Sequence, residues 1–359
     1  MLATTMHNDN STLIREQVEQ ALSEQTPLCI HGAQSHHFML PIYSEPSTID
    51  MTQHHGIIDY QPTELNIKAR AGTRISDIQQ ALAEQNQRLP TDFLRCAPDS
   101  TLGGSVAIGY TGSSRPFQGA IRDHILGAGL INGSAEILKC GGQVMKNVAG
   151  YDISRLLAGS RGTLGPILDI TLKVLPAPET RQTLIFEYKE NQAIQAMNQL
   201  AGQSLPISAC AYLDRRCLIR LEGTESVVNW ASQKLGGETL SDATAFWDSI
   251  QQQTHPFFQS THPIWRVIVP ATSNKLELEK HHQTMIDWCG GLRWVYADEI
   301  TQSDFMHISN LGGYIESYRA TTPTQPADMM TPLQKQMHRQ IKAAFDPAQV
   351  FNPALSKFD

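Results

Sequence analysis

Residues 99–107 read Asp-Ser-Thr-Leu-Gly-Gly-Ser-Val-Ala, and this stretch opens the most glycine-rich part of the chain. Two further clusters follow, at residues 146–152 (Lys-Asn-Val-Ala-Gly-Tyr-Asp) and 159–165 (Gly-Ser-Arg-Gly-Thr-Leu-Gly). Between Gly103 and Gly165 lie 14 of the 25 glycines. Glycine is needed where the backbone turns at positive φ or touches a ligand with no side chain in between. The clustering therefore predicts a large, phosphate-bearing cofactor lying along the main chain.

The first cluster begins with residue types that cap helices. Asp99, Ser100 and Thr101 precede two glycines and a small-residue helix. Such a helix start exposes N–H groups that favour a pyrophosphate. A plain glycine turn that packs a helix closely against a sheet explains the same residues, so both interpretations stay open.

Two more loops have a similar character. Residues 28–30 are predicted to form a strand that ends in residues 31–36, His-Gly-Ala-Gln-Ser-His, a natural nest of N–H groups for phosphate. Residues 159–167 form a third loop that leads into a strand. The alternatives are a surface turn for the first of these loops and a β-turn with a bulge for the other.

Bulk composition excludes several classes of protein. The chain has 359 residues, of which 41 % are hydrophobic, and a net charge of −7 without any run of Lys or Arg. This length suits two domains, and the charge argues against nucleic acid as the main partner. The first twelve residues are polar and no window is apolar for long enough to span a bilayer. We therefore expect no secretion signal and no transmembrane segment.

Residue types that bind metals are scattered. The six cysteines form no C-x-x-C pair, which favours reduced core thiols and excludes the familiar iron–sulfur spacings. Cys210 and Cys217 are expected on adjacent strands. Histidines occur in adjacent pairs such as His36-His37, whose side chains point to different sides. Surface histidine is the better interpretation of these pairs, and no metal site is expected.

Common catalytic and nucleotide-binding motifs are absent. The chain has no G-x-x-x-x-G-K-[ST], no G-x-G-x-x-G at the start of a βαβ unit, no G-x-S-x-G and no H-E-x-x-H. A P-loop protein, a Rossmann dehydrogenase, an α/β hydrolase and a zinc protease are therefore disfavoured.

The apolar periodicity predicts a mixed chain with a boundary at residues 176–178, Pro-Ala-Pro. Asn132-Gly133 between two apolar runs predicts a hairpin over residues 126–139. Beyond the boundary a β-α-β-β-α order is the opening of a ferredoxin-like unit. The stretch 299–330 is expected to be irregular, and no internal repeat is visible. Helices are predicted at residues 13–25, from 73 to before 90, and at 191–201, 224–235, 242–252, 275–288 and 332–345. Strands are predicted at 28–30, 49–51, 56–60, 65–69, 167–175, 184–188, 207–213, 217–221, 265–269 and 292–297.

Three segments taken in order carry a family resemblance. Residues 98–107, 122–127 (Arg-Asp-His-Ile-Leu-Gly) and 159–167 resemble the FAD-binding domain of the vanillyl-alcohol oxidase and p-cresol methylhydroxylase superfamily. Residues 144–152 are closest to its glycolate/lactate branch. Further segments look like the FAD-binding subunits of bacterial glycolate oxidases: residues 205–208, 220–223, 265–266, 290–294 and 351–353.

The resemblance implies an α+β fold. Residues 1–178 would form a two-part FAD-binding domain of the p-cresol methylhydroxylase type. Residues 179–330 would form a short ferredoxin-like α+β cap, and residues 331–359 a C-terminal helix and tail returning to the FAD domain.

The same resemblance implies the residues that hold FAD. In some relatives a histidine of the first loop binds FAD covalently; the matching position here is Ser35, so non-covalent FAD is expected. The cofactor-binding residues would be His31, Gly32, Ala33, Gln34, Ser35, His36, Pro98, Asp99, Thr101, Leu102, Gly103, Gly104, Ala107, Gly112, Arg122, Asp123, Gly162, Thr163, Leu164, Gly165 and Ile167.

Substrate residues are less well marked. A 2-hydroxy acid needs a group for its carboxylate, usually Arg, and Arg266 and Arg293 of the cap are candidates, with a structural role as the alternative. Lys146 and Tyr151, with their polar neighbours Asn147 and Asp152, either shape the flavin site or serve the fold. The metal-binding motifs of catalytic relatives are missing from the cap, so this chain is not expected to oxidise substrate alone.

The resemblance therefore implies an FAD-dependent oxidoreductase subunit that works in a glycolate oxidase complex. Its partners would be a larger FAD-containing catalytic subunit and an iron–sulfur subunit that takes the electrons. The location would be cytoplasmic, with peripheral membrane association through partners. The alternatives are a non-redox structural or assembly FAD subunit and a stand-alone flavin oxidase for another 2-hydroxy acid.

Overall fold

The chain divides into two compact units, each described by itself below. Unit 1 comprises residues 1–110, 120–177 and 330–359, and unit 2 comprises residues 111–119 and 178–329. The computed structural model describes residues 8–36, 38, 47–142, 153–279, 283–319 and 330–355.

The division differs from the expected domains at residues 111–119, which the sequence analysis placed in the FAD-binding domain. Within unit 2 the Ser113 hydroxyl donates to the Asp287 carboxylate at 2.9 Å, and the Trp288 indole N–H donates to the Gly112 carbonyl at 2.9 Å. Buried side-chain bonds therefore anchor this segment, and no local sequence pattern reveals them.

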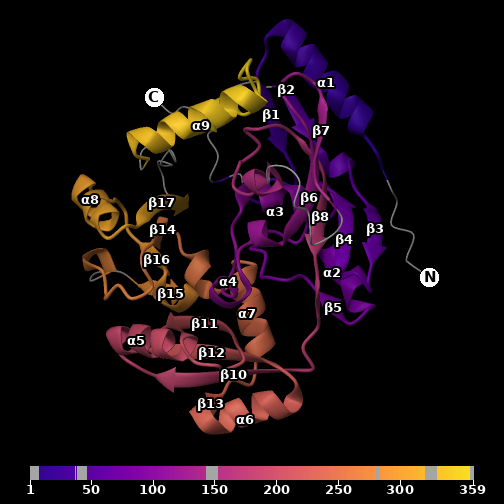
Figure 1. The fold of residues 1–359 in the computed structure, drawn as a ribbon. Coiled ribbons are helices and arrows are strands. Elements are labelled where there is room, and N and C mark those ends of the chain that lie inside the picture. The colour runs from indigo at the N-terminus through magenta and orange to yellow at the C-terminus, as the bar shows by residue number, and fades with distance from the viewer. Residues whose placement is uncertain are drawn as a thin grey trace. The chain divides into compact units, whose positions relative to one another are not determined.

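Unit 1 is built on an antiparallel five-stranded sheet of order β3-β4-β8-β6-β7 (Figure 1). A parallel pair, β1 and β2, and an antiparallel pair, β5 and β9, accompany it. The strands are β1 (Leu28–His31), β2 (Ser47–Asp50), β3 (Ile57–Gln61), β4 (Asn66–Arg70), β5 (Gln87–Arg88), β6 (Ile125–Ile131), β7 (Ile137–Gly141), β8 (Ile167–Lys173) and β9 (Leu175–Pro176). The helices are α1 (Ser11–Glu24), α2 (Ile75–Ala83), α3 (Leu102–Ile108) and α9 (Pro332–Phe345), and the 3-10 turns are η2 (Met51–Gln53), η3 (Ile121–His124), η4 (Ile153–Leu157) and η9 (Pro353–Leu355).

The core of unit 1 lies between this sheet and its helices. Ile67 of β4 pairs with Leu172 of β8, and both side chains are at most 1 % exposed. Leu102 and Val106 of α3 belong to the same apolar cluster. The predicted strand is therefore confirmed from residue 66, with Ile67 and Ala69 buried as expected, whereas Leu65 lies outside it at a positive φ and Asn66 is buried.

The predicted hairpin is present, but its turn is longer than an Asn-Gly pair suggests. Strands β6 and β7 are joined by residues 132–136. The Asn132 carboxamide oxygen accepts the N–H groups of Ser134 and Glu136, at 3.0 and 2.9 Å. Asn132 therefore organises a wider loop through its side chain.

Unit 2 contains an eight-stranded sheet of order β13-β10-β12-β11-β15-β16-β14-β17 (Figure 1). Its strands are β10 (Thr180–Glu187), β11 (Ile207–Leu213), β12 (Arg216–Gly223), β13 (Glu238–Thr239), β14 (Ile264–Ile268), β15 (Thr284–Asp287), β16 (Leu292–Tyr296) and β17 (Tyr314–Arg319). The helices are α4 (Arg115–Gln118), α5 (Glu190–Ala201), α6 (Glu225–Leu235), α7 (Ala243–Gln251) and α8 (Gln302–Asn310), with 3-10 turns η5 (Pro256–Gln259), η6 (Glu277–Glu279) and η7 (Trp288–Gly290).

The sheet of unit 2 is a tandem of two similar halves. In the first half the order β13-β10-β12-β11 places the fourth, first, third and second strands side by side, as in a split βαβ unit. Read inward from the other edge, β17-β14-β16-β15 repeats this order. Antiparallel pairing of β11 with β15 joins the halves. The repeat is one of topology, which explains why the sequence shows none.

Two predictions in the second half are wrong. Residues 284–287, expected in a helix over 275–288, form the central strand β15. The stretch 299–330, expected to be irregular, contains α8 and β17. In both cases sheet pairing overrides the local pattern: β15 lies between β11 and β16, and β17 pairs with β14.

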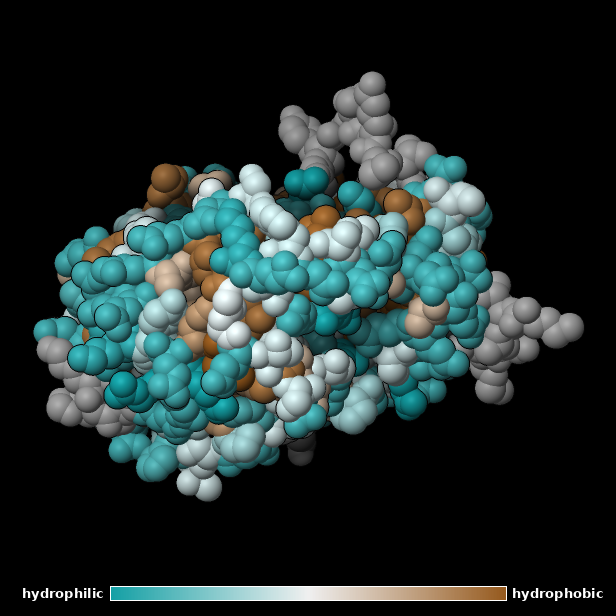
Figure 2. All heavy atoms as spheres, turned by 90° about the horizontal axis from the view of Figure 1, so that it is seen from below, coloured by the Kyte–Doolittle hydropathy of each residue, from teal (hydrophilic) through white to brown (hydrophobic). Residues whose placement is uncertain are grey.

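On the face drawn in Figure 2, hydrophilic residues cover most of the surface and hydrophobic residues form small groups among them. None of the helices within the described ranges combines the length and the apolar character needed to cross a bilayer.

Candidate functional site

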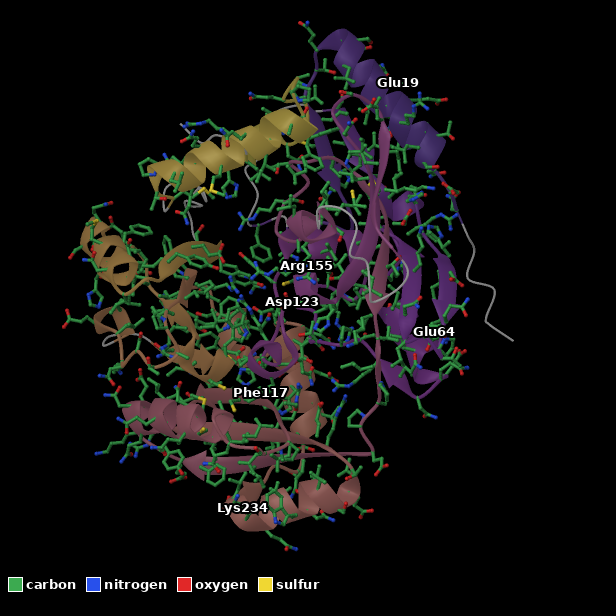
Figure 3. The ribbon with its side chains drawn as sticks, in the orientation of Figure 1. Glu19, Glu64, Phe117, Asp123, Arg155 and Lys234 are labelled. Carbon is green, nitrogen blue, oxygen red and sulfur yellow. The ribbon has the colours of Figure 1, made fainter. Side chains whose placement is uncertain are left out.

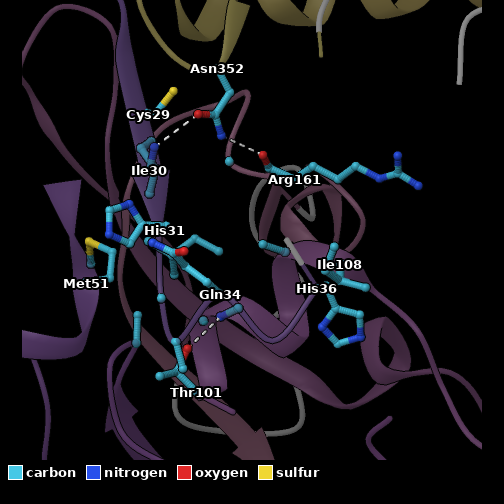
Figure 4. A pocket seen from close by; sticks show the side chains of 18 of the residues that line it. Cys29, Ile30, His31, Gln34, His36, Met51, Thr101, Ile108, Arg161 and Asn352 are labelled. Carbon is cyan, nitrogen blue, oxygen red and sulfur yellow. Dashed lines mark hydrogen bonds between the residues drawn. The ribbon is translucent and has the colours of Figure 1, made fainter. Parts of the chain in front are cut away.

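A cavity of about 290 Å³ in unit 1 gathers most of the predicted loops (Figure 4). It lies among the end of β1, helix α3, the loop before β8 and the residues after α9. Its volume is near the lower end of the range for small-molecule sites. The lining residues are Cys29, Ile30, His31, Gly32, Ala33, Gln34, Ser35, His36, Met51, Ala71, Thr101, Gly103, Gly104, Ala107, Ile108, Arg161, Gly162, Gly165, Ile167, Asn352 and Leu355.

The first loop, residues 32–36, contributes backbone donors. The N–H groups of Gly32, Ala33 and Ser35 donate to no acceptor in the described parts of the chain. A partly buried N–H group without a protein partner is satisfied by water or by a ligand. Successive donors of this kind suit an anion such as a phosphate group.

The start of α3 behaves differently from the expectation. Its first three N–H groups are bonded within unit 1, to the carbonyls of Thr73 at 2.8 Å and Ala71 at 2.7 Å and to the hydroxyl of the cap residue Thr101 at 3.3 Å. The prediction of exposed N–H groups at this helix start is therefore wrong. These N–H groups are already bonded to the carbonyls of Thr73 and Ala71 and to the Thr101 hydroxyl. The segment therefore contributes small residues, and not free donors, to the cavity wall.

The two glycines of α3 have different roles: one allows close packing of the helix on the neighbouring backbone, and the other faces the cavity. A Cβ on Gly103 would lie 2.6 Å from the Cβ of Ala71, so this glycine serves close packing of the helix. A Cβ on Gly104 would meet only the Thr101 hydroxyl within 4 Å, at 3.0 Å. Gly32 faces the same hydroxyl, at 2.5 Å. Gly32 and Gly104 therefore keep the cavity wall free of side chains.

The third loop adds a buried donor. Gly162 is buried at a φ of +73°, and its N–H group has no acceptor among the residues that the structure describes. The neighbouring Arg161 N–H donates to the Ala107 carbonyl at 2.8 Å, which ties the loop to α3. Gly165 has a φ of +134°, and a Cβ there would lie 2.0 Å from the Ile131 carbonyl oxygen. Gly165 is therefore required by the backbone, and Gly162 faces the cavity.

His36 sits at one end of the first loop and is 6 % exposed. Its Nδ1 lies 3.2 Å from the Ser35 hydroxyl and its Nε2 lies 3.2 Å from the Cys96 thiol. Its ring also makes an edge contact with Tyr110. These neighbours hold the ring in place, so His36 shapes the cavity wall.

Some predicted cofactor residues do not line the cavity. Pro98 and Asp99 are exposed, Leu102 and Leu164 belong to the core, and the Thr163 hydroxyl donates to the Ser160 carbonyl. Gly112 belongs to unit 2, where its carbonyl accepts the Trp288 indole N–H.

Arg122 and Asp123 belong to the turn η3, and Figure 3 labels Asp123. The Asp123 carboxylate accepts the Ala120 N–H at 2.8 Å, and the Arg122 side chain is 61 % exposed. Neither residue lines the cavity. Among the weaker candidates, Lys146 and Tyr151, with Asn147 and Asp152, lie outside the described residues.

The two cap arginines are buried in the sheet of unit 2. Arg266 is 3 % exposed, and its guanidinium forms an ion pair with Glu316 at 2.5 Å. Arg293 is fully buried and donates to the Ser273 carbonyl at 2.9 Å. Neither side chain reaches the surface. Their surroundings therefore fit a structural role better than binding of a substrate carboxylate.

The structure adds lining residues that sequence reasoning did not assign to the cofactor. Met51, Ala71, Arg161 and Asn352 are the main ones. Asn352 belongs to the segment Phe-Asn-Pro that supported the family resemblance, but nothing local indicates that it lies beside β1. Arg161 lies within the third glycine cluster, whose glycines were the signal for a cofactor loop.

Charge at the cavity fits a diphosphate. Among the described lining residues none is a carboxylate, and Arg161 carries the one fixed positive charge. The N–H groups of the first loop and of Gly162 supply further donors without adding bulk. This donor set suits the pyrophosphate of FAD.

The structure also places the histidines, cysteines and carboxylates of the described ranges. In the described parts of the chain no three His, Cys, Asp or Glu side chains gather to hold a metal. Cys210 and Cys217 lie on the adjacent strands β11 and β12, as predicted. Burial raises the pKa of the Cys217 thiol to about 12, which leaves it protonated and unreactive.

Residues 9–141 match the FAD binding domain family, which confirms the predicted cofactor. The chain is similar in fold to a solved structure of alkyldihydroxyacetonephosphate synthase, with a TM-score of 0.65 and 16 % identity over 95 % of this chain and 75 % of that one. This likeness confirms the expected fold class.

Two bacterial relatives extend the comparison. The chain is 32 % identical to the glycolate oxidase subunit GlcD of Bacillus subtilis over 124 residues, which cover 34 % of this chain and 26 % of that one. It is 39 % identical to the glycolate oxidase subunit GlcE of Escherichia coli over 346 residues, which cover 96 % of this chain and 97 % of that one. The chain therefore belongs to the family of the glycolate oxidase subunit GlcE, whose members are FAD-dependent oxidoreductases.

Proposed function

We propose that this chain is the FAD-binding subunit of a glycolate oxidase complex that converts glycolate to glyoxylate. The observation that carries the proposal is the end-to-end similarity to GlcE, 39 % identity over 97 % of that subunit. The cavity of unit 1 supports it, because its unpartnered N–H groups and its single cation suit the cofactor that the family binds.

The residues of unit 1 would bind the cofactor mainly through the main chain. The N–H groups of Gly32, Ala33, Ser35 and Gly162 would donate to the diphosphate, and the Arg161 guanidinium would offset its charge. The redox chemistry would be supplied by the bound FAD, which can accept electrons and pass them on. The role of the chain is then to bind, orient and shield that group.

We further propose that substrate binding and the next electron transfer involve partner subunits. The buried positions of Arg266 and Arg293 leave no arginine of the predicted pair at the surface for a carboxylate. The cysteine spacing offers no familiar iron–sulfur ligand set. A larger FAD-containing subunit would hold glycolate and an iron–sulfur subunit would take the electrons. The complex would be cytoplasmic, with peripheral membrane association through those partners.

The test is to purify the chain alone, record its visible spectrum, and add glycolate without oxygen. We expect a bound flavin that keeps its colour with glycolate and bleaches only when the partner subunits are added. A folded chain without flavin, and unable to take up added FAD, contradicts the cofactor assignment.

The same experiment separates the two alternatives. Bleaching of the isolated chain by glycolate or another 2-hydroxy acid indicates a stand-alone oxidase. A flavin that never bleaches, even in the complete and active complex, indicates a structural or assembly subunit whose FAD carries no electrons.

Non-covalent attachment is a separate prediction. Ser35 stands where some relatives have the attaching histidine, and its hydroxyl is engaged with His36. Acid or denaturant should therefore release all of the yellow chromophore into solution. Colour that stays with the precipitated protein contradicts this prediction.

A further inference from the structure

A buried ion pair lies at the C-terminal end of α9. The Lys342 ammonium and the Asp346 carboxylate are 2.6 Å apart, and their side chains are 5 % and 0 % exposed. A buried pair is costly to desolvate and is often no more stabilising than apolar residues of the same volume. Its position in unit 1 therefore needs an explanation beyond stability.

Both members of the pair hold other parts of unit 1. The Lys342 ammonium donates to the carbonyls of Thr163, at 2.7 Å, and Phe351, at 2.8 Å. The Asp346 carboxylate accepts the N–H groups of Val350, at 3.1 Å, and Phe351, at 2.8 Å. The pair thus fixes the segment after α9 against the third glycine loop.

The same segment is joined to β1. The Val350 carbonyl accepts the Leu28 N–H at 2.8 Å, and the Asn352 N–H donates to the Leu28 carbonyl at 3.0 Å. These bonds form a parallel bridge between Leu28 and Phe351. The ion pair therefore also determines where Asn352 stands relative to β1.

Asn352 connects two loops of the cavity (Figure 4). Its side-chain oxygen accepts the Ile30 N–H at 3.0 Å, and its side-chain nitrogen donates to the Arg161 carbonyl at 2.8 Å. Ile30 lies two residues before Gly32, and Arg161 precedes Gly162. The carboxamide thus spans the two places where backbone donors face the cavity.

We propose that Lys342, Asp346 and Asn352 form a C-terminal clamp that positions the two donor loops for FAD. Asn352 sets the spacing of the loops, and the buried pair sets the position of Asn352. These are positioning residues, and the inference rests on the proposed binding of FAD in this cavity. A clamp of this kind is expected to slow the release of FAD by keeping the donors in the geometry of the diphosphate.

The main test is Asn352→Asp in the full-length chain. Aspartate keeps the acceptor for the Ile30 N–H and tolerates the φ of +42° at this position, but it cannot donate to the Arg161 carbonyl. The matched control is Asn229→Asp on an exposed position of α6 in unit 2, which makes the same chemical change away from the cavity. Apoprotein is titrated with FAD, and the dissociation rate is followed by flavin fluorescence.

We expect Asn352→Asp to weaken FAD binding about tenfold or more, mainly through faster release, with the flavin emission at saturation shifted from that of the wild type. The Asn352→Asp apoprotein should stay folded with a lower unfolding midpoint, because the Arg161 carbonyl loses its buried donor, whereas Asn229→Asp should match the wild type in both FAD release and unfolding. The double variant Lys342→Met/Asp346→Asn, which lines no part of the cavity and adds no net charge, should release FAD faster as well.

The outcomes separate the clamp from the proposed function. Wild-type protein that binds no FAD overturns both. Wild-type protein that binds FAD, with both clamp variants equally tight and equally slow to release it, overturns the clamp alone. Apoproteins that unfold in both clamp variants also overturn it, because the contacts then serve the fold and not the cofactor.

Discussion

The backbone donors at the cavity of unit 1 and the arginines in the sheet of unit 2 are partnered in different ways. Around the cavity of unit 1, N–H groups of Gly32 and Gly162 have no acceptor in the described chain. In the sheet of unit 2, charged groups lie at least as deep but are matched. Arg266 meets Glu316, and the Arg220 guanidinium donates to the Ser208 hydroxyl at 2.8 Å while lying 3.3 Å from the Glu222 carboxylate.

This difference teaches where a ligand belongs. A protein satisfies its interior polar groups unless something else is to bind them. In unit 1, backbone donors without an acceptor in the described chain coincide with glycines that leave the cavity wall without side chains, and this combination indicates a binding site. In unit 2, Arg220 and Arg266 face acceptors within the sheet, so these arginines are part of its fold.

The largest expected effect is a loss of stability on breaking the buried Arg266–Glu316 ion pair of unit 2. Glu316→Ala should lower the free energy of unfolding of unit 2 by about 3 kcal/mol, because it leaves the Arg266 charge buried without this counter-ion. All five tryptophans lie in unit 2, at Trp230, Trp247, Trp265, Trp288 and Trp294. Urea unfolding followed by tryptophan fluorescence therefore reports on this unit.

Two further variants sharpen that test. Arg266→Met/Glu316→Leu should recover stability to within about 1 kcal/mol of the wild type, because it removes both charges together. Glu299→Ala, at an exposed position of the same unit, controls for loss of a carboxylate. A double variant that is stable and yet abolishes glycolate-dependent reduction in the assembled complex would return Arg266 to the substrate site.

The next effect divides the two glycines of α3. Gly104→Val should weaken FAD binding by tenfold or more with little change in apoprotein stability, because its side chain enters the cavity wall. Gly103→Val should instead lower the stability of unit 1 by about 1–3 kcal/mol, because the position is already in contact with Ala71. FAD titration and amide hydrogen exchange of β4 and α3 measure the two effects.

Equal loss of FAD affinity in both glycine variants, with both apoproteins stable, would contradict this division. That result would mean that both Gly103 and Gly104 contact the cofactor. Retained stoichiometric FAD in Gly104→Val would contradict the placement of the diphosphate beside this helix.

Features of the site that depend on neighbouring residues could be predicted from the sequence. The loop at residues 31–36 is predicted from the short polar and small residues that follow a strand, and the loop at residues 159–165 from a glycine cluster before a strand; both contribute residues to the cavity wall. The alternation of Ile67 and Ala69 was enough to place β4 in a sheet. A turn or a strand restricts the residue types at its own positions, so these elements can be recognised from a short stretch of sequence.

Features that depend on distant pairing could not be predicted. Residues 275–288 have helical apolar spacing, but β15 forms because β11 and β16 offer it a central position. Asn352 is 322 residues from its partner Ile30. The pairing of the first two α3 N–H groups was equally hidden, because their acceptors are the carbonyls of residues 73 and 71, in the turn before α2, whereas the third bonds to the local cap residue Thr101.

The smallest expected effect is a pH dependence of the stability of unit 1 that comes from His54. This side chain does not line the cavity, and it has a hydrogen-bond partner. His54 is 2 % exposed, and its Nδ1 accepts the Asn10 N–H at 3.0 Å, just before α1. Burial lowers the pKa of His54 from its usual 6.5, partly opposed by the Asp9 carboxylate, and Arg70 lowers it further.

The sign of the resulting pH dependence follows from this shift. Below about pH 6.5 the unfolded chain binds more protons at His54 than the folded chain does, so the stability of unit 1 falls as the pH falls through that range. Hydrogen exchange of α1, corrected for the intrinsic rate, should lose protection between pH 7 and pH 5. His54→Asn keeps an acceptor for the Asn10 N–H and does not titrate, so it should flatten the dependence. An unchanged pH profile in that variant would assign the loss of protection to other titratable groups of unit 1.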